Sequence, residues 1–178
     1  MMASMETPSE PRRVSPWVAL RAVVWSILFV GTVAYYLPVT FFGFDPRAIR
    51  LDAPRHGLGL LMMAAGGALA VACIAEFVRT GHGTPMPVDA PRRLVVRGPY
   101  RFVRNPMYVG AAGLLAGEIV IAWSPALLVY ALTWLFLIHL LVVLYEEPTL
   151  AARFGESYAR YRAHVRRWIP RFDRPYVG

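Results

Sequence analysis

Long runs of apolar residues alternate with shorter polar segments along this chain. A helix needs about 20 mostly apolar residues to cross the hydrocarbon of a bilayer, which is roughly 30 Å thick. Four runs qualify, at residues 17–37, 56–78, 107–123 and 126–145. Only Ser124 and Pro125 separate the last two runs, so we expect a tight helical hairpin there. The pattern predicts an all-α integral membrane protein with about four transmembrane helices.

The segment after Pro148 carries a different pattern. Apolar or aromatic side chains recur at steps of three and four, which places them on one face of a helix. They are Leu150, Phe154, Tyr158, Tyr161, Val165 and Trp168. Arginines occupy other positions of this segment, and beside a membrane span such a helix is typical of the lipid interface rather than of nucleic-acid binding. We expect an interfacial amphipathic helix at the C-terminal end and no nucleic-acid partner.

The first residues of the chain differ from the rest. Residues 1–16 are polar and contain three prolines, which predicts a flexible N-terminal lead. The apolar run that follows is too long for the central region of a signal peptide, so we expect it to remain as the first membrane helix. A chain of 178 residues is the size of one domain. Residues 17–178 are therefore predicted to form a single membrane domain.

The chain has few charged residues, and basic residues outnumber acidic ones. Only 17% of the residues are charged, the formal net charge is +8, and all 19 basic residues are arginine. A water-soluble protein of this length could not cover its surface with so few charges. Sixteen arginines lie in three regions that four spans would place on one face: the N-terminal region, the loop after the second run and the C-terminal tail. Because basic loops stay inside, both termini are predicted to be cytoplasmic, in a bacterial cytoplasmic membrane.

The run at residues 56–78 is rich in glycine and alanine, including Gly66 and Gly67. Small side chains let helix backbones approach closely in lipid. They could instead leave a lateral gap, beside the Tyr108 end of the third run, through which a lipophilic substrate reaches a site. The sequence leaves both interpretations open.

The densest polar cluster lies where the third run begins. Asn105 before Pro106 is typical of a helix start, with asparagine as N-cap and proline in the first turn. In the predicted hairpin, facing residues have numbers that sum to about 249, from the helical rise per residue. Glu146 and Glu147 then lie beside Arg104 and Asn105. Two carboxylates, arginines and a helix N-terminus could hold a zwitterion, or could form a purely structural ion-pair network.

Three motifs in this region resemble a known family. They are GPYRFVRNPMYVG at 98–110, the Glu146-Glu147 pair, and FGESY at 154–158 followed by Tyr161 and Pro170. This ordered set is similar to the isoprenylcysteine carboxyl methyltransferases, whose wider relatives include phospholipid N-methyltransferases. The resemblance covers residues 98–170. It implies S-adenosylmethionine as methyl donor, bound between the family's Arg-His-Pro-x-Tyr motif and the acidic pair.

The resemblance also implies roles for individual residues. Arg104 and Glu146 are implied to be catalytic, and the cofactor-binding set is Tyr100, Arg104, Asn105, Pro106, Tyr108, Glu146 and Glu147. Asn105 stands where the family usually has histidine; asparagine can cap a helix but cannot be protonated near neutral pH. The four histidines are too scattered to predict a metal site. The acceptor would be lipophilic or small, with a carboxylate, thiol or amine as nucleophile.

Two other functions remain open from the sequence. A sterol-reductase-like enzyme that uses NADPH has a similar membrane core, and a non-catalytic membrane scaffold needs no cofactor. Two further polar residues interrupt the apolar runs. Glu118 is expected to be structural, and His139 to be either structural or part of an acceptor pocket.

Overall fold

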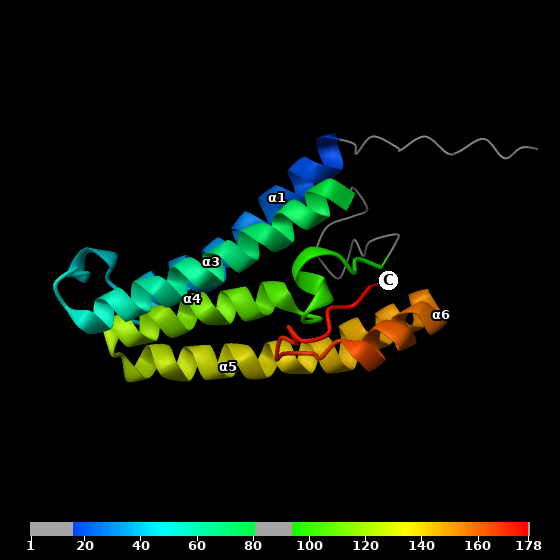
Figure 1. Ribbon diagram of the computed structural model, residues 1–178. Coiled ribbons are helices and arrows are strands. Elements are labelled where there is room, and N and C mark those ends of the chain that lie inside the picture. The colour runs from blue at the N-terminus through cyan, green and yellow to red at the C-terminus, as the bar shows by residue number, and fades with distance from the viewer. Residues whose placement is uncertain (1–15, 81–93, 178) are drawn as a thin grey trace, which may run out of the picture.

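The computed structural model describes residues 16–80 and 94–177, which form a bundle of helices (Figure 1). The predicted N-terminal lead lies almost wholly outside the described residues. Helix is the only regular structure in the described ranges. The elements are α1 (Pro16–Gly31), η1 (Thr32–Tyr36), α2 (Leu37–Phe41), η2 (Pro46–Ala48), α3 (Pro54–Thr80), η4 (Gly98–Arg101), α4 (Pro106–Ala122), α5 (Pro125–Leu141), η5 (Val142–Glu146) and α6 (Glu147–His164).

Three helical segments are long and apolar enough to cross a membrane. They are Val23–Phe41, Pro54–Glu76 and the segment that starts at Pro125 and includes α5; the apolar helix Pro106–Ala122 is shorter. The prediction of an all-α membrane protein is thus confirmed. The first helix runs on to Phe41 rather than ending near residue 37, because η1 and α2 continue α1 without a break.

Two π-helical turns explain how the long helices pass through prolines. The turns are η1 and η5, and Pro38 and Pro148 each stand two residues after one of them. A proline ring clashes with the carbonyl four residues earlier in a regular α-helix. Here that carbonyl belongs to the wider π turn, a form that often occurs at functional sites. The helix therefore continues past each proline, and η5 leads directly into the acidic pair.

Helices α3 and α4 pack side by side over most of their lengths (Figure 1). A Cβ atom on Gly66 would lie 2.5 Å from the carbonyl oxygen of Gly110 and 2.8 Å from the amide nitrogen of Leu114. Gly59, Gly113 and Gly117 line the same close contact. The small residues therefore allow backbone contact, and the alternative of a lateral gap at Gly66 is wrong.

The turn between α4 and α5 forms the predicted hairpin. Ser124 Oγ accepts a hydrogen bond from the amide of Leu127 (3.3 Å) and donates one to the carbonyl of Phe42 (3.1 Å). The turn is thereby joined to the end of α2. Glu118, six residues before Ser124, is 0% exposed, and neither carboxylate oxygen has a hydrogen-bond partner among the described residues. This placement agrees with the inward, structural position expected for Glu118.

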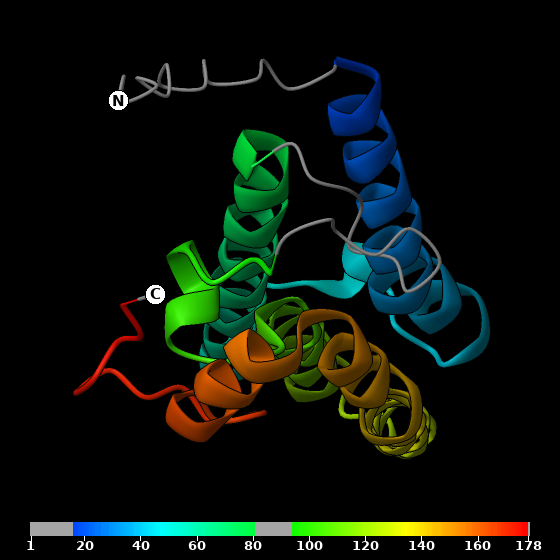
Figure 2. The same ribbon diagram turned by 90° about the vertical axis from the view of Figure 1, so that its right-hand side faces the viewer.

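The C-terminal helix α6 is broken at Gly155, whose φ of 50° lies in the left-handed region that glycine adopts without strain. The second half of α6 and the segment after it lie across one end of the bundle (Figure 2). Its apolar face packs within the protein: Tyr158, Tyr161 and Val165 are buried against neighbours that include Leu94 and Val96. The predicted apolar face is confirmed for Leu150, Phe154, Tyr158, Tyr161 and Val165, which share one cluster despite the bend at Gly155; Trp168 does not belong to it, because the helix ends at His164.

We predict that Gly66→Ala destabilises the protein by about 1–3 kcal/mol, because the added methyl group collides with the backbone of α4 and cannot be relieved by a rotamer change. Gly67→Ala is the matched control, since its Cβ would lie 3.9 Å from the nearest atom, a methyl carbon of Leu114. Alanine is the better helix former by up to about 1 kcal/mol, so the control variant is expected to be neutral or stabilised. Unfolding in detergent micelles measures both; equal stabilities would contradict the close contact.

Candidate functional site

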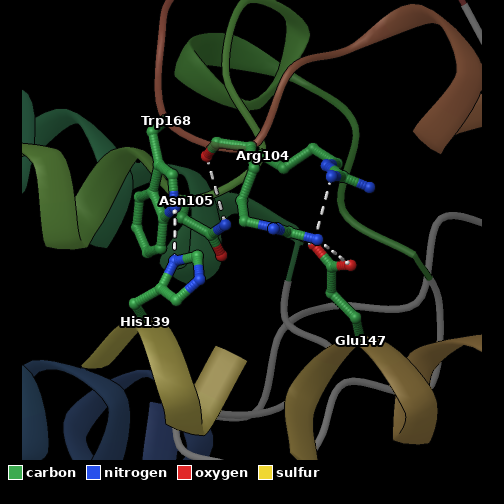
Figure 3. Close-up of polar contacts among 6 residues, drawn as sticks. Arg104, Asn105, His139, Glu147 and Trp168 are labelled. Carbon is green, nitrogen blue, oxygen red and sulfur yellow. Dashed lines mark hydrogen bonds and ion pairs between the residues drawn. The ribbon is translucent and has the colours of Figure 1, made fainter. Parts of the chain in front are cut away.

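The hairpin brings the start of α4 beside the acidic pair, which lies where η5 meets α6. Arg104 Nη2 lies 3.1 Å from Glu147 Oε1 in an ion pair (Figure 3). Glu146 accepts a hydrogen bond from the hydroxyl of Tyr108. Consecutive residues on a helix point in different directions, so the two carboxylates have different partners. The pairing deduced from the hairpin spacing is thus close to the pairing in the structure.

Arg104 keeps part of its guanidinium free inside the protein. Its side chain is only 10% exposed and that of Glu147 only 9%. The Nε and Nη1 atoms of Arg104 are buried without a hydrogen-bond partner among the described residues. An arginine carries five N–H donors, and a buried donor without a partner costs free energy. These two nitrogens lie on opposite sides of the planar guanidinium, so each is a separate donor that suits a carboxylate or phosphate oxygen.

The C-terminal tail supplies a second arginine to the same carboxylate. Arg167 donates from Nε (2.7 Å) and Nη2 (2.9 Å) to the two oxygens of Glu147, in a bidentate pair. This hydrogen bond raises the pKa of the Arg167 guanidinium. The sequence analysis did not single out Arg167. It is one of seven arginines in the tail, and no spacing distinguishes it from the others.

Asn105 occupies the N-cap position of α4 but does not act as a cap. Its side chain makes no capping hydrogen bond; instead Nδ2 donates to the carbonyl of Arg167 at 3.2 Å. The amide of Arg104 also donates to the tail, at the carbonyl of Arg166 (2.9 Å). The predicted side-chain cap is therefore wrong, because the tail competes for the asparagine. The start of α4 is held by the tail.

The remaining residues implied by the resemblance surround this centre. Pro106 is buried in the first turn of α4, as the helix-start pattern predicted. Tyr100 lies in η4, where its carbonyl accepts a hydrogen bond from the Tyr161 hydroxyl (2.7 Å). Burial raises the pKa of the Tyr100 hydroxyl, which also contacts the Cys73 thiol. Tyr100 thus joins η4 to α3 and α6.

His139 belongs to a small cluster that the tail completes. The indole Nε1 of Trp168 donates to His139 Nδ1 at 3.2 Å (Figure 3). The Trp168 ring also lies 6.5 Å from the ring of Tyr108, between centroids. Trp168 was expected on the apolar face of the C-terminal helix. Nothing in the sequence indicates that it contacts both His139 and Tyr108.

We predict that Glu147→Gln lowers the free energy of unfolding by about 3 kcal/mol, because it leaves two arginines without their counter-charge in a largely buried site. The matched control is Asp173→Asn, which removes a carboxylate from the more exposed pair with Arg171 (3.5 Å). Such a pair contributes about 0–1 kcal/mol. Denaturant unfolding of both variants tests this; a loss no larger than that of the control would show that the pair is not a structural centre.

A comparison with protein families finds a match that includes the part of the site before residue 158. The model of the family described as phospholipid methyltransferase matches residues 54–157, which is more than half of the chain and includes the Arg104 region and the acidic pair. No curated protein and no solved structure matches the chain. The match confirms the resemblance drawn from the three motifs, and it makes the chain a membrane methyltransferase by family. The chain belongs to the phospholipid methyltransferase family.

Proposed function

We propose that this membrane methyltransferase transfers a methyl group from S-adenosylmethionine to an acceptor held in the bilayer. The observation that carries the proposal is that Arg104 keeps two buried donors, Nε and Nη1, without a partner among the described residues while its Nη2 pairs with Glu147. The cofactor is a zwitterion at its amino-acid end and carries a sulfonium. Its carboxylate matches the unpaired donors of Arg104, and its positive groups match the carboxylate of Glu146.

The start of α4 adds a second feature that suits an anion. The first N–H groups of a helix have no intrahelical partner and carry partial positive charge. Here the Asn105 side chain is bonded to the tail, so it does not cover them. Pro106 has no N–H, which leaves the amides of Met107 and Tyr108 to receive a carboxylate together with Arg104. Glu147 would then act mainly by positioning Arg104.

The cofactor supplies an already activated methyl group, so the protein has to orient the two reactants and exclude water. Glu146 lies at the end of the membrane helix and accepts the Tyr108 hydroxyl proton in a hydrogen bond. We assign Glu146 the removal of a proton from the acceptor when this is an ammonium or a thiol. A carboxylate acceptor needs no such step. The family description favours the headgroup of a phospholipid, whose amine would lose one proton to Glu146 and gain the methyl group.

The arginine distribution supports a cytoplasmic site. A polar donor reaches the site only from the aqueous side where the cofactor is present, and the acidic pair lies at the same end of the bundle as α6 and the tail (Figures 1 and 2). We therefore propose that both termini are cytoplasmic, in a bacterial cytoplasmic membrane.

The first test concerns the cofactor. Arg104→Lys keeps a positive charge beside Glu147 but lacks the Nε and Nη1 donors of the guanidinium. We expect the affinity for S-adenosylhomocysteine, measured by calorimetry on the purified protein, to fall about tenfold or more with little change in thermal stability. Arg171→Lys is the control and is expected to bind normally. An Arg104→Lys protein with full affinity, or displacement of the ligand by NADPH, would refute the proposed cofactor site.

The second test concerns the chemical step. We expect Glu146→Gln to lower kcat about a hundredfold, the scale of general base catalysis, while the affinity for S-adenosylhomocysteine changes much less. Transfer of a radiolabelled methyl group into extracted lipids or into water-soluble products measures the rate and also shows the acceptor class. If kcat stays near that of the unaltered protein, Glu146 does not remove the proton.

The third test concerns orientation in the membrane. Cys73 is the single cysteine and is buried, so a Cys73→Ser background allows one exposed position to be labelled at a time. We expect Val177→Cys to react only from the cytoplasmic side and Arg47→Cys, in the loop after α2, only from the opposite side. The reverse labelling pattern would separate the site from cytoplasmic cofactor.

A further inference from the structure

A hollow of about 530 Å³ lies between the second half of α6 and the end of the chain. Its lining includes three basic side chains from two segments. The lining residues are Arg160, His164, Arg174, Pro175, Tyr176 and Val177. None of them belongs to the site around Glu147. The family match ends at residue 157, before the first of them.

The walls of the hollow are fixed by hydrogen bonds. The amide of Tyr176 donates to the carbonyl of Arg101 (3.1 Å), and Arg101 Nε donates back to the carbonyl of Tyr176 (2.9 Å). The Tyr176 ring packs against His164, with 5.8 Å between the ring centroids. The end of the tail is thereby held on η4 and α6. Arg174 is kept near the last turns of α6 by these contacts.

The charge in the hollow has no counter-charge. Arg160 and Arg174 form no ion pair among the residues that the structure describes. The adjacent Asp173 pairs with Arg171 instead, and Glu156, one turn before Arg160 on α6, makes no ion pair. Two arginines and a histidine thus line one hollow, and no carboxylate side chain is among its lining residues.

His164 adds a donor or acceptor with a defined geometry. Its Nδ1 atom lies 2.8 Å from the carbonyl of Arg160, one turn earlier, so Nδ1 carries the proton that makes this hydrogen bond. Nε2 is left for another partner. Arginine is well suited to phosphate because its planar N–H groups match two phosphate oxygens, and a bound phosphate would satisfy all three basic side chains.

We propose that this hollow is a binding site for a phosphate-bearing anion, separate from the methyl-transfer site. Its volume is larger than a phosphate ion requires, which favours a phosphate carried on a small polar group. Two sources share this chemistry: the headgroup of an anionic phospholipid and a soluble phosphorylated metabolite. In the first case the site would hold the end of α6 and the tail at an anionic membrane surface.

The experiment titrates the purified full-length protein in neutral detergent with two probes that carry the same phosphomonoester, glycerol 3-phosphate and short-chain phosphatidic acid. Arg160→Gln combined with Arg174→Gln removes both guanidinium groups. Arg174→Gln alone changes an exposed residue whose side chain makes no ion pair with another described residue. The control is Arg153→Gln, an equally exposed arginine on α6 that does not line the hollow. Calorimetry gives the affinities, and thermal unfolding without probe shows that each variant is folded.

We expect binding of at least one probe to weaken about tenfold or more in the double variant and several-fold in Arg174→Gln, with the control unchanged. Tighter binding of phosphatidic acid than of glycerol 3-phosphate identifies the lipid as the source, and equal binding identifies the soluble phosphate. The proposal is overturned if neither probe binds at millimolar concentration, or if Arg153→Gln weakens binding as much as the double variant does. In that last case the affinity comes from the overall positive charge.

Discussion

The rest of the structure depends on how the charge of the buried Glu147 is compensated. A carboxylate that is nine-tenths buried is stable only when its charge is compensated and its oxygens are bonded. Arg104 from the start of α4 and Arg167 from the tail provide this compensation. The carboxylate itself stands on the long helix that continues α5. One ion-pair centre therefore fixes three segments, and two of them are separated by 63 positions in the chain.

The centre needs a rigid support, and the support comes from the apolar part of the bundle. Helices α3 and α4 approach until their backbones touch at Gly66 and Gly110, so α4 cannot shift without a steric clash. The π turn η5 lets the long helix pass Pro148 while it presents Glu146 and Glu147 in different directions. Arg104 is thus held between a fixed helix start and a fixed carboxylate. Its unpaired N–H groups are a consequence of this geometry.

The tail gives the site its outer wall. It runs back over the start of α4, where backbone hydrogen bonds join Arg166 to Arg104 and Arg171 to Phe102. Trp168 extends from it to His139 and Tyr108. The same tail ends beside α6, where it forms the basic hollow. The tail therefore connects the site around Glu147 to a second region with several basic side chains.

The sequence by itself determined the helical membrane class, the hairpin at Ser124-Pro125 and the proximity of Arg104 to the acidic pair. These features depend on local quantities: the length of an apolar run, the residues of a turn and the helical rise per residue. It could not determine that Asn105 would bond to the tail, that Arg167 would share Glu147, or that Gly66 would contact the backbone of α4. Each of these contacts depends on which distant segment of the chain packs at that position. Periodicity also could not show that α6 bends at Gly155, because a glycine in a helical pattern is compatible with either a helix or a left-handed turn. Only the tertiary structure decided between them: Gly155 has a φ of 50°, and the residues on both sides of it still pack on one apolar cluster.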